Sequence, residues 1–177
     1  MNRVIFIIFI LIFSINLHSK VKILNIIEVA EGVFVHQGKH FDVDESYQGD
    51  IANIGFIVGK DSVAVIDSGG SPTIGRALKA SIREKTSLPI KYVINTHVHL
   101  DHIYGNAAFT EKDIEFIGHS ELPKAMALRK ELYERLNLEY LNIPIEESIQ
   151  ISPSIFIKVN ESKVFDLGGR KIKISAY

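Results

Sequence analysis

Residues 96–102 have the sequence Thr96-His97-Val98-His99-Leu100-Asp101-His102, which places four potential metal ligands within six positions. In an extended segment, residues two apart project to the same side, so His97 and His99 can close on one cation. Asp101 and His102 follow where the chain must turn, and they can reach a second position beside the first. Imidazoles with one carboxylate suit zinc first, and iron or manganese less well.

A structural metal is the alternative interpretation of this cluster. Structural zinc sites are usually closed by four Cys or His ligands, and Cys is common among them. The chain contains no Cys. The cluster therefore favours a site with an open position for chemistry over a closed structural site.

Two motifs resemble those of a known superfamily. The pattern His97-x-His99-x-Asp101-His102, after a strand-like run and before a Gly, is similar to the signature of metallo-β-lactamase-fold hydrolases. The upstream Asp67-Ser68-Gly69 resembles the strand-ending Asp-x-Gly of the same superfamily. This likeness covers roughly residues 27–177. Within the superfamily, the runs at residues 51–59, 66–70 and 88–94 most resemble the exported zinc metallohydrolases named for the quinoprotein relay system.

The resemblance implies a fold and a reaction. The fold is α/β, or α+β by some schemes, and corresponds to the N-terminal part of a four-layer αββα sandwich. The implied enzyme is a zinc-dependent hydrolase in which a metal-bound hydroxide attacks an ester, thioester, lactone or amide-like bond of a small-molecule substrate. His97, His99, Asp101 and His102 would bind one or two zinc ions, and Asp101 would also orient the nucleophile.

Asp67 and the segment at residues 38–50 have two interpretations each, and His119 has one. By resemblance, Asp67 fixes the backbone or a ligand imidazole near the metals; alternatively it is an ordinary Asp turn. His119 is a possible substrate-facing residue that is not a ligand. Residues 38–50 lack a sustained period, which indicates a loop: either a flap whose Phe41 or Tyr47 covers substrate, or a solvated connection with locally packed aromatics.

The composition limits the possible partners. A chain of 177 residues is long enough for one domain with a proper core. The formal net charge of −1 gives no electrostatic reason to expect nucleic acid as a partner. The absence of Cys excludes disulfides and thiolate chemistry.

The N-terminal segment has the layout of a secretory signal. Arg3 precedes an unbroken apolar run at residues 4–13, and more polar residues follow up to Ser19. The run is shorter than the about 20 apolar residues that span a membrane. We predict a signal peptide at residues 1–19, a metallo-β-lactamase-like domain at 20–177, and export to the periplasm or the exterior. The alternative is an uncleaved anchor, so membrane contact is expected only through this segment.

The remaining patterns predict alternating strands and helices. Short strands are expected at residues 26–30, 33–37, 51–58, 62–66, 90–95 and 114–118, with a hairpin over residues 164–174. Ser71-Pro72 predicts the start of a helix with one apolar stripe, and a long helix is expected after residue 120. The irregular stretch at residues 143–153 carries no recognisable chemistry.

By resemblance, the chain corresponds to one half of the fold and the first hairpin of the second half. The sequence contains no His after His119, so the third His that one metal would need is missing. The remaining ligands of the other metal are missing as well. We therefore expect a fragment, inactive by itself, with an apolar sheet face that favours association. Two rival functions remain: a mononuclear iron sulfur-oxidising enzyme on the same scaffold, and a non-catalytic truncated metal-binding module. A link to quinoprotein metabolism rests on analogy alone.

Overall fold

The computed structural model describes residues 23–40, 42–44 and 46–177. The predicted signal peptide at residues 1–19 lies outside these ranges, and so does Phe41, one of the two aromatics expected to cover a substrate. Among the described residues, no helix has both the length and the apolar character needed to cross a bilayer.

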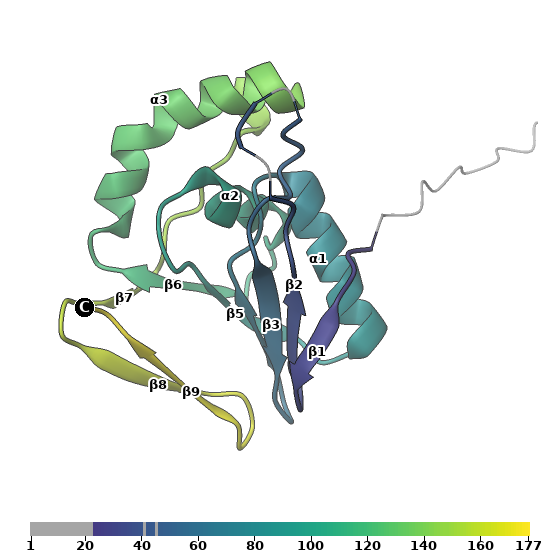
Figure 1. Cartoon of the computed structure of the whole chain (residues 1–177). Coiled ribbons are helices and arrows are strands. Elements are labelled where there is room, and N and C mark those ends of the chain that lie inside the picture. The colour runs from purple at the N-terminus through teal and green to yellow at the C-terminus, as the bar shows by residue number, and fades with distance from the viewer. Residues whose placement is uncertain (1–22, 41, 45) are drawn as a thin grey trace, which may run out of the picture.

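One mixed sheet forms the body of the described chain (Figure 1). Its neighbours follow the sequence order: β1 (Ile27–Ala30), β2 (Val33–His36), β3 (Ile54–Val58), β4 (Val63–Ile66), β5 (Ile90–Ile94), β6 (Glu115–His119) and β7 (Ile155–Ile157). Strands β1 to β4 pair antiparallel, whereas β4 to β7 pair parallel. The carboxyl ends of β4, β5 and β6 therefore meet at one edge, where sheets flanked by helices usually carry their chemistry.

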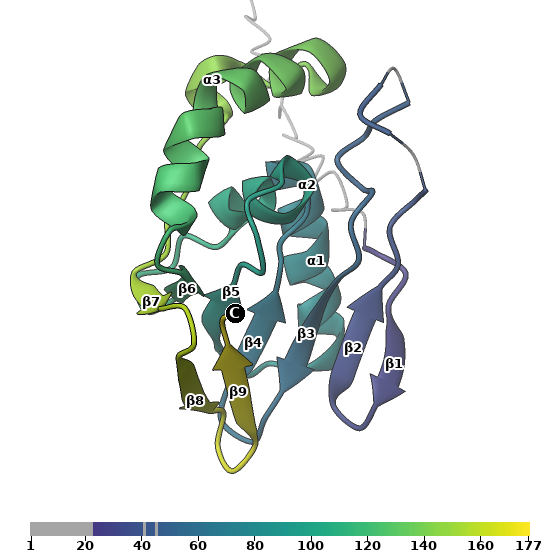
Figure 2. The same ribbon diagram turned by 60° about the vertical axis from the view of Figure 1, so that its left-hand side comes forward.

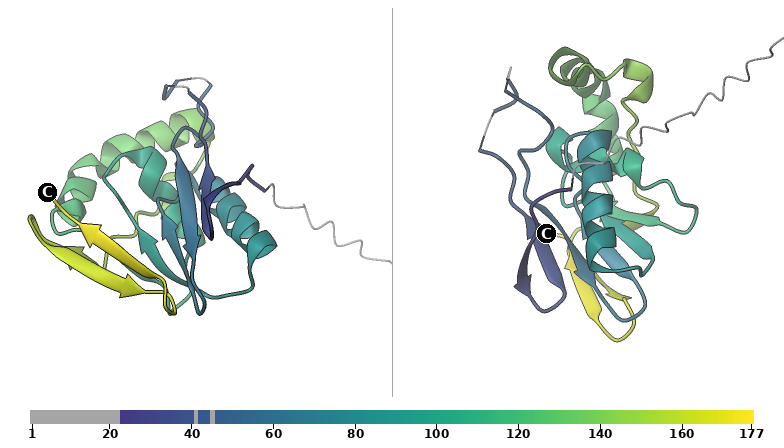
Figure 3. Two further views of the ribbon diagram at one scale, coloured as in Figure 1. Left: turned by 60° about the horizontal axis from the view of Figure 1, so that its bottom comes forward. Right: turned by 90° about the vertical axis from the view of Figure 1, so that its right-hand side faces the viewer.

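Helix α1 (Pro72–Lys85) covers one face of this sheet, and Figure 3 shows it lying along the strands. The Ser71 side chain accepts a hydrogen bond from the Ile74 backbone N–H, and Pro72 occupies the first turn. This start matches the prediction, because a capping hydroxyl followed by Pro is a local signal. Leu78 and Ile82 are fully buried against Val63, Val65 and other side chains of the sheet.

A hairpin of β8 (Ser162–Asp166) and β9 (Lys171–Ser175) covers part of the opposite face (Figure 2). Phe165 and Leu167 pack there against Tyr92 and other side chains of the main sheet. The resulting order of helix, sheet and second sheet confirms the predicted α/β class and part of the predicted sandwich.

The remaining elements gather near the carboxyl ends of the parallel strands. They are α2 (Leu100–Ile103), η1 (Tyr104–Ala108), α3 (Leu122–Leu141) and η2 (Ile145–Glu147). Gly105 lies so close to the Ser68 carbonyl that an added Cβ would sit 1.9 Å from that oxygen. Because only glycine fits there, the α2–η1 turn can pack directly onto the end of β4.

Most strand ends lie within one or two residues of the prediction, but the start of β3 and the existence of β7 differ more. Strand β3 begins at Ile54 and not at residue 51, since Asn53 uses its side chain to accept a hydrogen bond from the Gly38 N–H. Strand β7 was not predicted. It is three residues long and pairs only with β6, so it carries too few residues for a recognisable period.

Candidate metal centre

His97 and His99 come together directly after β5. The His97 Nε2 and His99 Nδ1 atoms are 3.1 Å apart, and the two rings meet edge to face. His99 has extended backbone and occupies the position before α2, so the chain is still open where these two rings project. The alternation expected from their spacing therefore places both imidazoles on one side.

Asp101 and His102 form a second pair on α2. The His102 Nε2 atom lies 3.3 Å from the Asp101 Oδ2 atom. The ring centroids of His97 and His102 are 4.0 Å apart, which brings the second pair against the first. All four predicted ligands thus occupy one neighbourhood, with Nε2 of both His97 and His102 turned toward a partner side chain.

Asp67 lies beneath both pairs at the end of β4. Its carboxylate accepts hydrogen bonds from the Thr96 backbone N–H at 2.8 Å, the Thr96 hydroxyl at 2.7 Å and His102 Nδ1 at 2.8 Å. The residue is 3% exposed and has a left-handed backbone, with φ of 54°. Asp67, His97 and His102 also form a group whose ligand atoms lie within 4.8 Å of one another. Because both Asp67 oxygens already accept hydrogen bonds, we assign Asp67 to orienting His102.

At Asp101 and His102, hydrogen bonds and neighbouring charges oppose the effect of burial on the pKa. Burial raises the pKa of Asp101, but the hydrogen bond and charge of His102 outweigh it and leave the pKa lowered. Burial lowers the pKa of His102, but hydrogen bonds to Asp101 and Asp67 outweigh it and raise the pKa to about 9. The pKa of His97 is lowered by burial and by the neighbouring His102. The His97 imidazole is therefore neutral at pH 7 and can offer a nitrogen lone pair to a metal. A cation that binds to His102 must first displace a proton from its ring.

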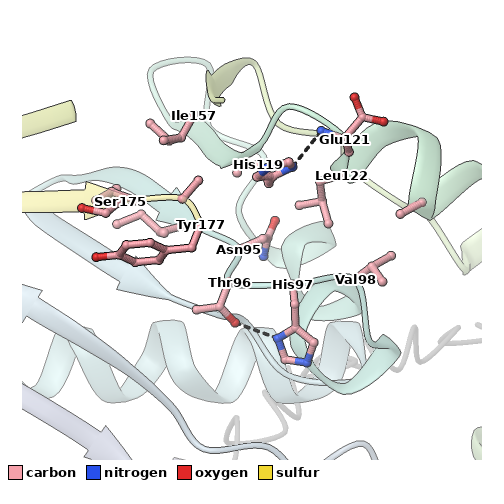
Figure 4. Close-up of a pocket in the computed structure, with 15 residues that line it drawn as sticks. Asn95, Thr96, His97, Val98, His119, Glu121, Leu122, Ile157, Ser175 and Tyr177 are labelled. Carbon is pink, nitrogen blue, oxygen red and sulfur yellow. Dashed lines mark hydrogen bonds between the residues drawn. The ribbon is translucent and has the colours of Figure 1, made fainter. Parts of the chain in front are cut away.

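A cavity of about 590 Å³ opens beside His97, between β5, β6, the start of α3 and the end of β9. Figure 4 shows Thr96, His97 and His119 on its wall, together with apolar side chains such as Leu122 and Ile157. His119 Nδ1 accepts a hydrogen bond from the Glu121 backbone N–H at 3.0 Å. The structure thus places His119 on the wall of the cavity that His97 also lines, apart from the four clustered ligands.

Tyr47 does not face this cavity. Its side chain is 1% exposed and packs with Leu100, Tyr104 and other residues of the α2–α3 cluster. Burial raises the pKa of its phenol, and the hydroxyl lies 3.5 Å from the Gly70 carbonyl oxygen. The expectation that Tyr47 covers a substrate is therefore wrong for this structure, because the ring anchors the loop at residues 38–50 to the core.

A network of buried polar side chains lies beneath the site and was not predicted from the sequence. Ser68 and Asn106 are fully buried, Asn95 nearly so, and Asn106 hydrogen-bonds both of the others. The His102 carbonyl accepts from the Ser68 backbone N–H at 2.9 Å and lies 3.2 Å from the Ser68 hydroxyl. The one local signal was Asn95-Thr96, a polar pair between a buried strand and the His cluster.

Comparisons with known proteins find one matching family and several proteins of similar structure. Residues 47–172 match the family model described as the metallo-beta-lactamase superfamily. A metallo-beta-lactamase from Hirschia baltica superposes with a TM-score of 0.58 at 16% identity, covering 80% of this chain and 57% of that one. One from Erythrobacter litoralis gives 0.55 at 18% identity, covering 76% and 50%. The sec-alkylsulfatase Pisa1 from Pseudomonas sp. gives 0.62 at 14% identity, covering 85% and 27%.

These identities support a shared fold and nothing finer. The chain spans about half the length of the two metallo-beta-lactamases and about a quarter of the alkylsulfatase. No curated protein matches the sequence.

Proposed function

The chain belongs to the metallo-beta-lactamase superfamily, and from this premise we propose that it supplies the metal-binding part of a zinc-dependent hydrolase. The carrying observation is the pair of short separations between ligand atoms. His97 Nε2 and His99 Nδ1 are 3.1 Å apart, and His102 Nε2 and Asp101 Oδ2 are 3.3 Å apart. Two ligands at about 2.0–2.1 Å from one tetrahedral zinc lie about 3.3 Å from each other.

The donor atoms fit such a metal. His97 and His99 would hold one ion, while Asp101 and His102 would hold a second, or widen the coordination of the first. Imidazole nitrogens and one carboxylate, without thiolate, suit zinc in preference to copper(I) or an iron–sulfur cluster. Each pair would supply two ligands, so the remaining positions on each ion would be filled by ligands from the second half of the fold, by water or by substrate.

Hydrolysis follows from what these side chains would do together. A zinc ion in this setting supplies a water of pKa about 7 and polarises the oxygen of the substrate. Asp101, which keeps its charge because its pKa is lowered, would orient the attacking water. His119, on the cavity wall beside His97, would contact the substrate. A small molecule with an ester, thioester, lactone or amide-like bond is the proposed substrate class. Export through the N-terminal segment is proposed on the sequence pattern alone.

Zinc binding by the full chain tests the ligand assignment. Metal analysis after dialysis against zinc should find the ion in the unmodified protein and only background in His99→Ala, because one of the two closest ligand atoms is lost. His40→Ala is the matched control, since His40 is exposed and outside the cluster, and it should retain zinc.

Unchanged zinc content in His99→Ala would overturn the assignment. Iron retained in preference to zinc would favour the sulfur-oxidising alternative. Zinc bound without hydrolysis of ester, thioester and lactone reporters is the result expected of this chain alone. The same result in a protein that also carries the second half of the fold would favour the non-catalytic metal-binding module.

A further inference from the structure

Thr96 links Asp67 to His97. The Thr96 hydroxyl donates to Asp67 Oδ2 at 2.7 Å, and its oxygen lies 2.8 Å from His97 Nδ1 (Figure 4 shows the second contact). The Thr96 backbone N–H donates to the other Asp67 oxygen at 2.8 Å. One carboxylate thus holds both the backbone and the side chain of the residue that precedes the first His.

The hydrogen count fixes the direction of these contacts. A threonine hydroxyl has one hydrogen and can accept on its oxygen. Because that hydrogen goes to Asp67, the contact with His97 requires a hydrogen on the imidazole, at Nδ1. A neutral imidazole carries one N–H, so His97 Nε2 then presents its lone pair.

We propose that Thr96 is a positioning residue that selects the Nδ1–H tautomer of His97, so that Nε2 is ready to bind a metal. His102 also contacts Asp67, but without an intermediary: its Nδ1 lies 2.8 Å from the Asp67 carboxylate, and its Nε2 lies 3.3 Å from Asp101 Oδ2. Asp67 therefore sets one ring in each ligand pair, directly in one case and through Thr96 in the other.

The contact between Thr96 and His97 should increase the affinity of His97 for zinc, an expectation that rests on the proposed zinc site. Partners that orient a ligand imidazole typically change metal affinity by about 10- to 100-fold when removed. Thr96 is exposed, so its hydroxyl contributes little to the packed core. Its removal should thus affect the imidazole more than the fold.

Ring-nitrogen NMR of the metal-free full chain at pH 8 tests the tautomer directly. His97 should carry its hydrogen on Nδ1 in the unmodified protein. In Thr96→Val, which keeps the shape and loses the hydroxyl, the hydrogen population should move toward Nε2; Thr96→Ser should restore it. His102 is the internal control within each spectrum. Thr110→Val, at another exposed threonine, is the matched control and should leave both rings unchanged.

Zinc titration of the same variants gives the second measurement. Thr96→Val should bind zinc about 10- to 100-fold more weakly, with Thr96→Ser near the unmodified protein. Because Thr96→Val also removes one hydrogen bond to Asp67, binding is compared at a temperature at which both variants are fully folded. An unchanged His97 tautomer in Thr96→Val would overturn the inference, even if zinc binds. The expected tautomer in a protein that binds no zinc would support the role of Thr96 and overturn the proposed function instead.

Discussion

Asp67 is the residue on which most of the site's hydrogen bonds converge, and its two oxygens accept from three donors. Asp67→Asn removes one acceptor and turns an amide N–H₂ toward groups that are themselves donors. Asn tolerates the left-handed backbone at this position, so the change isolates the hydrogen bonding. We expect the free energy of unfolding of the metal-free protein to fall by about 1–3 kcal/mol, as measured by urea denaturation.

Asp113→Asn is the control for this change, because Asp113 is exposed. It should alter the free energy of unfolding by less than about 0.5 kcal/mol. Equal stability of Asp67→Asn and the unmodified protein would show that the three hydrogen bonds contribute nothing net to folding.

At the same scale, sequence spacing predicted which candidate ligands lie close together but not the residues that support them. His97, His99, Asp101 and His102 lie within six positions, so local geometry brings them together. Thr96 acquires its role only through Asp67, which is 29 positions earlier in the chain. Nothing local distinguishes that threonine from any other, because the partner arrives through the parallel pairing of β4 with β5.

Strand β2 and the loop at residues 38–50 are joined by an ion pair between His36 and Asp50. The His36 ring is buried, with Nε2 2.6 Å from Asp50 Oδ1 and Nδ1 3.0 Å from the Asn25 carbonyl oxygen. Both neighbours are acceptors, so only the imidazolium can donate to both. The hydrogen bond to Asp50 is the main reason that the pKa of His36 is raised, against the opposing effect of burial.

Stability should therefore depend on pH through this pair. Because the folded-state pKa of His36 is raised, its contribution is complete below the unfolded-state pKa of about 6.5 and is lost as pH rises through the folded-state value. Asp50→Asn should lower the free energy of unfolding by about 1–2 kcal/mol at pH 6, and by less at pH 9. Denaturant titrations at both pH values measure the difference. His40→Gln, at an exposed His, should show no such trend; a gap for Asp50→Asn that widens with pH would contradict the assignment.

Elements with a local signal were the predictable ones. Ser71-Pro72 marks the start of α1, and Gly168-Gly169 marks the turn of the β8–β9 hairpin, where both glycines have positive φ. Strand β7 has no comparable signal, because its three residues are strand only by pairing with β6. The burial of Tyr47 was equally hidden, since the packing cluster comes from α2, η1 and α3, far along the chain.

On the scale of the whole molecule, the second sheet is the β8–β9 hairpin, and it packs on the main sheet through the side chain of Leu167. Leu167 is fully buried against Tyr92, Ile117 and other side chains of the main sheet, and its carbonyl accepts from the Asp61 N–H at 3.0 Å. Val164 lies on the same hairpin and is 59% exposed. One side of the hairpin thus packs on the main sheet, and the other side faces solvent.

Leu167→Ala should loosen the second sheet. Truncating a buried leucine costs about 2–5 kcal/mol, whereas the exposed Val164→Ala should cost less than about 0.5 kcal/mol. Because the lost contacts join the hairpin to the main sheet, amide hydrogen exchange should speed up in β8 and β9 more than in β3 and β4, which α1 covers from the other face. Uniform acceleration in all strands would mean that the two sheets unfold as one cooperative unit, and equal effects of the two substitutions would contradict the docking role of Leu167.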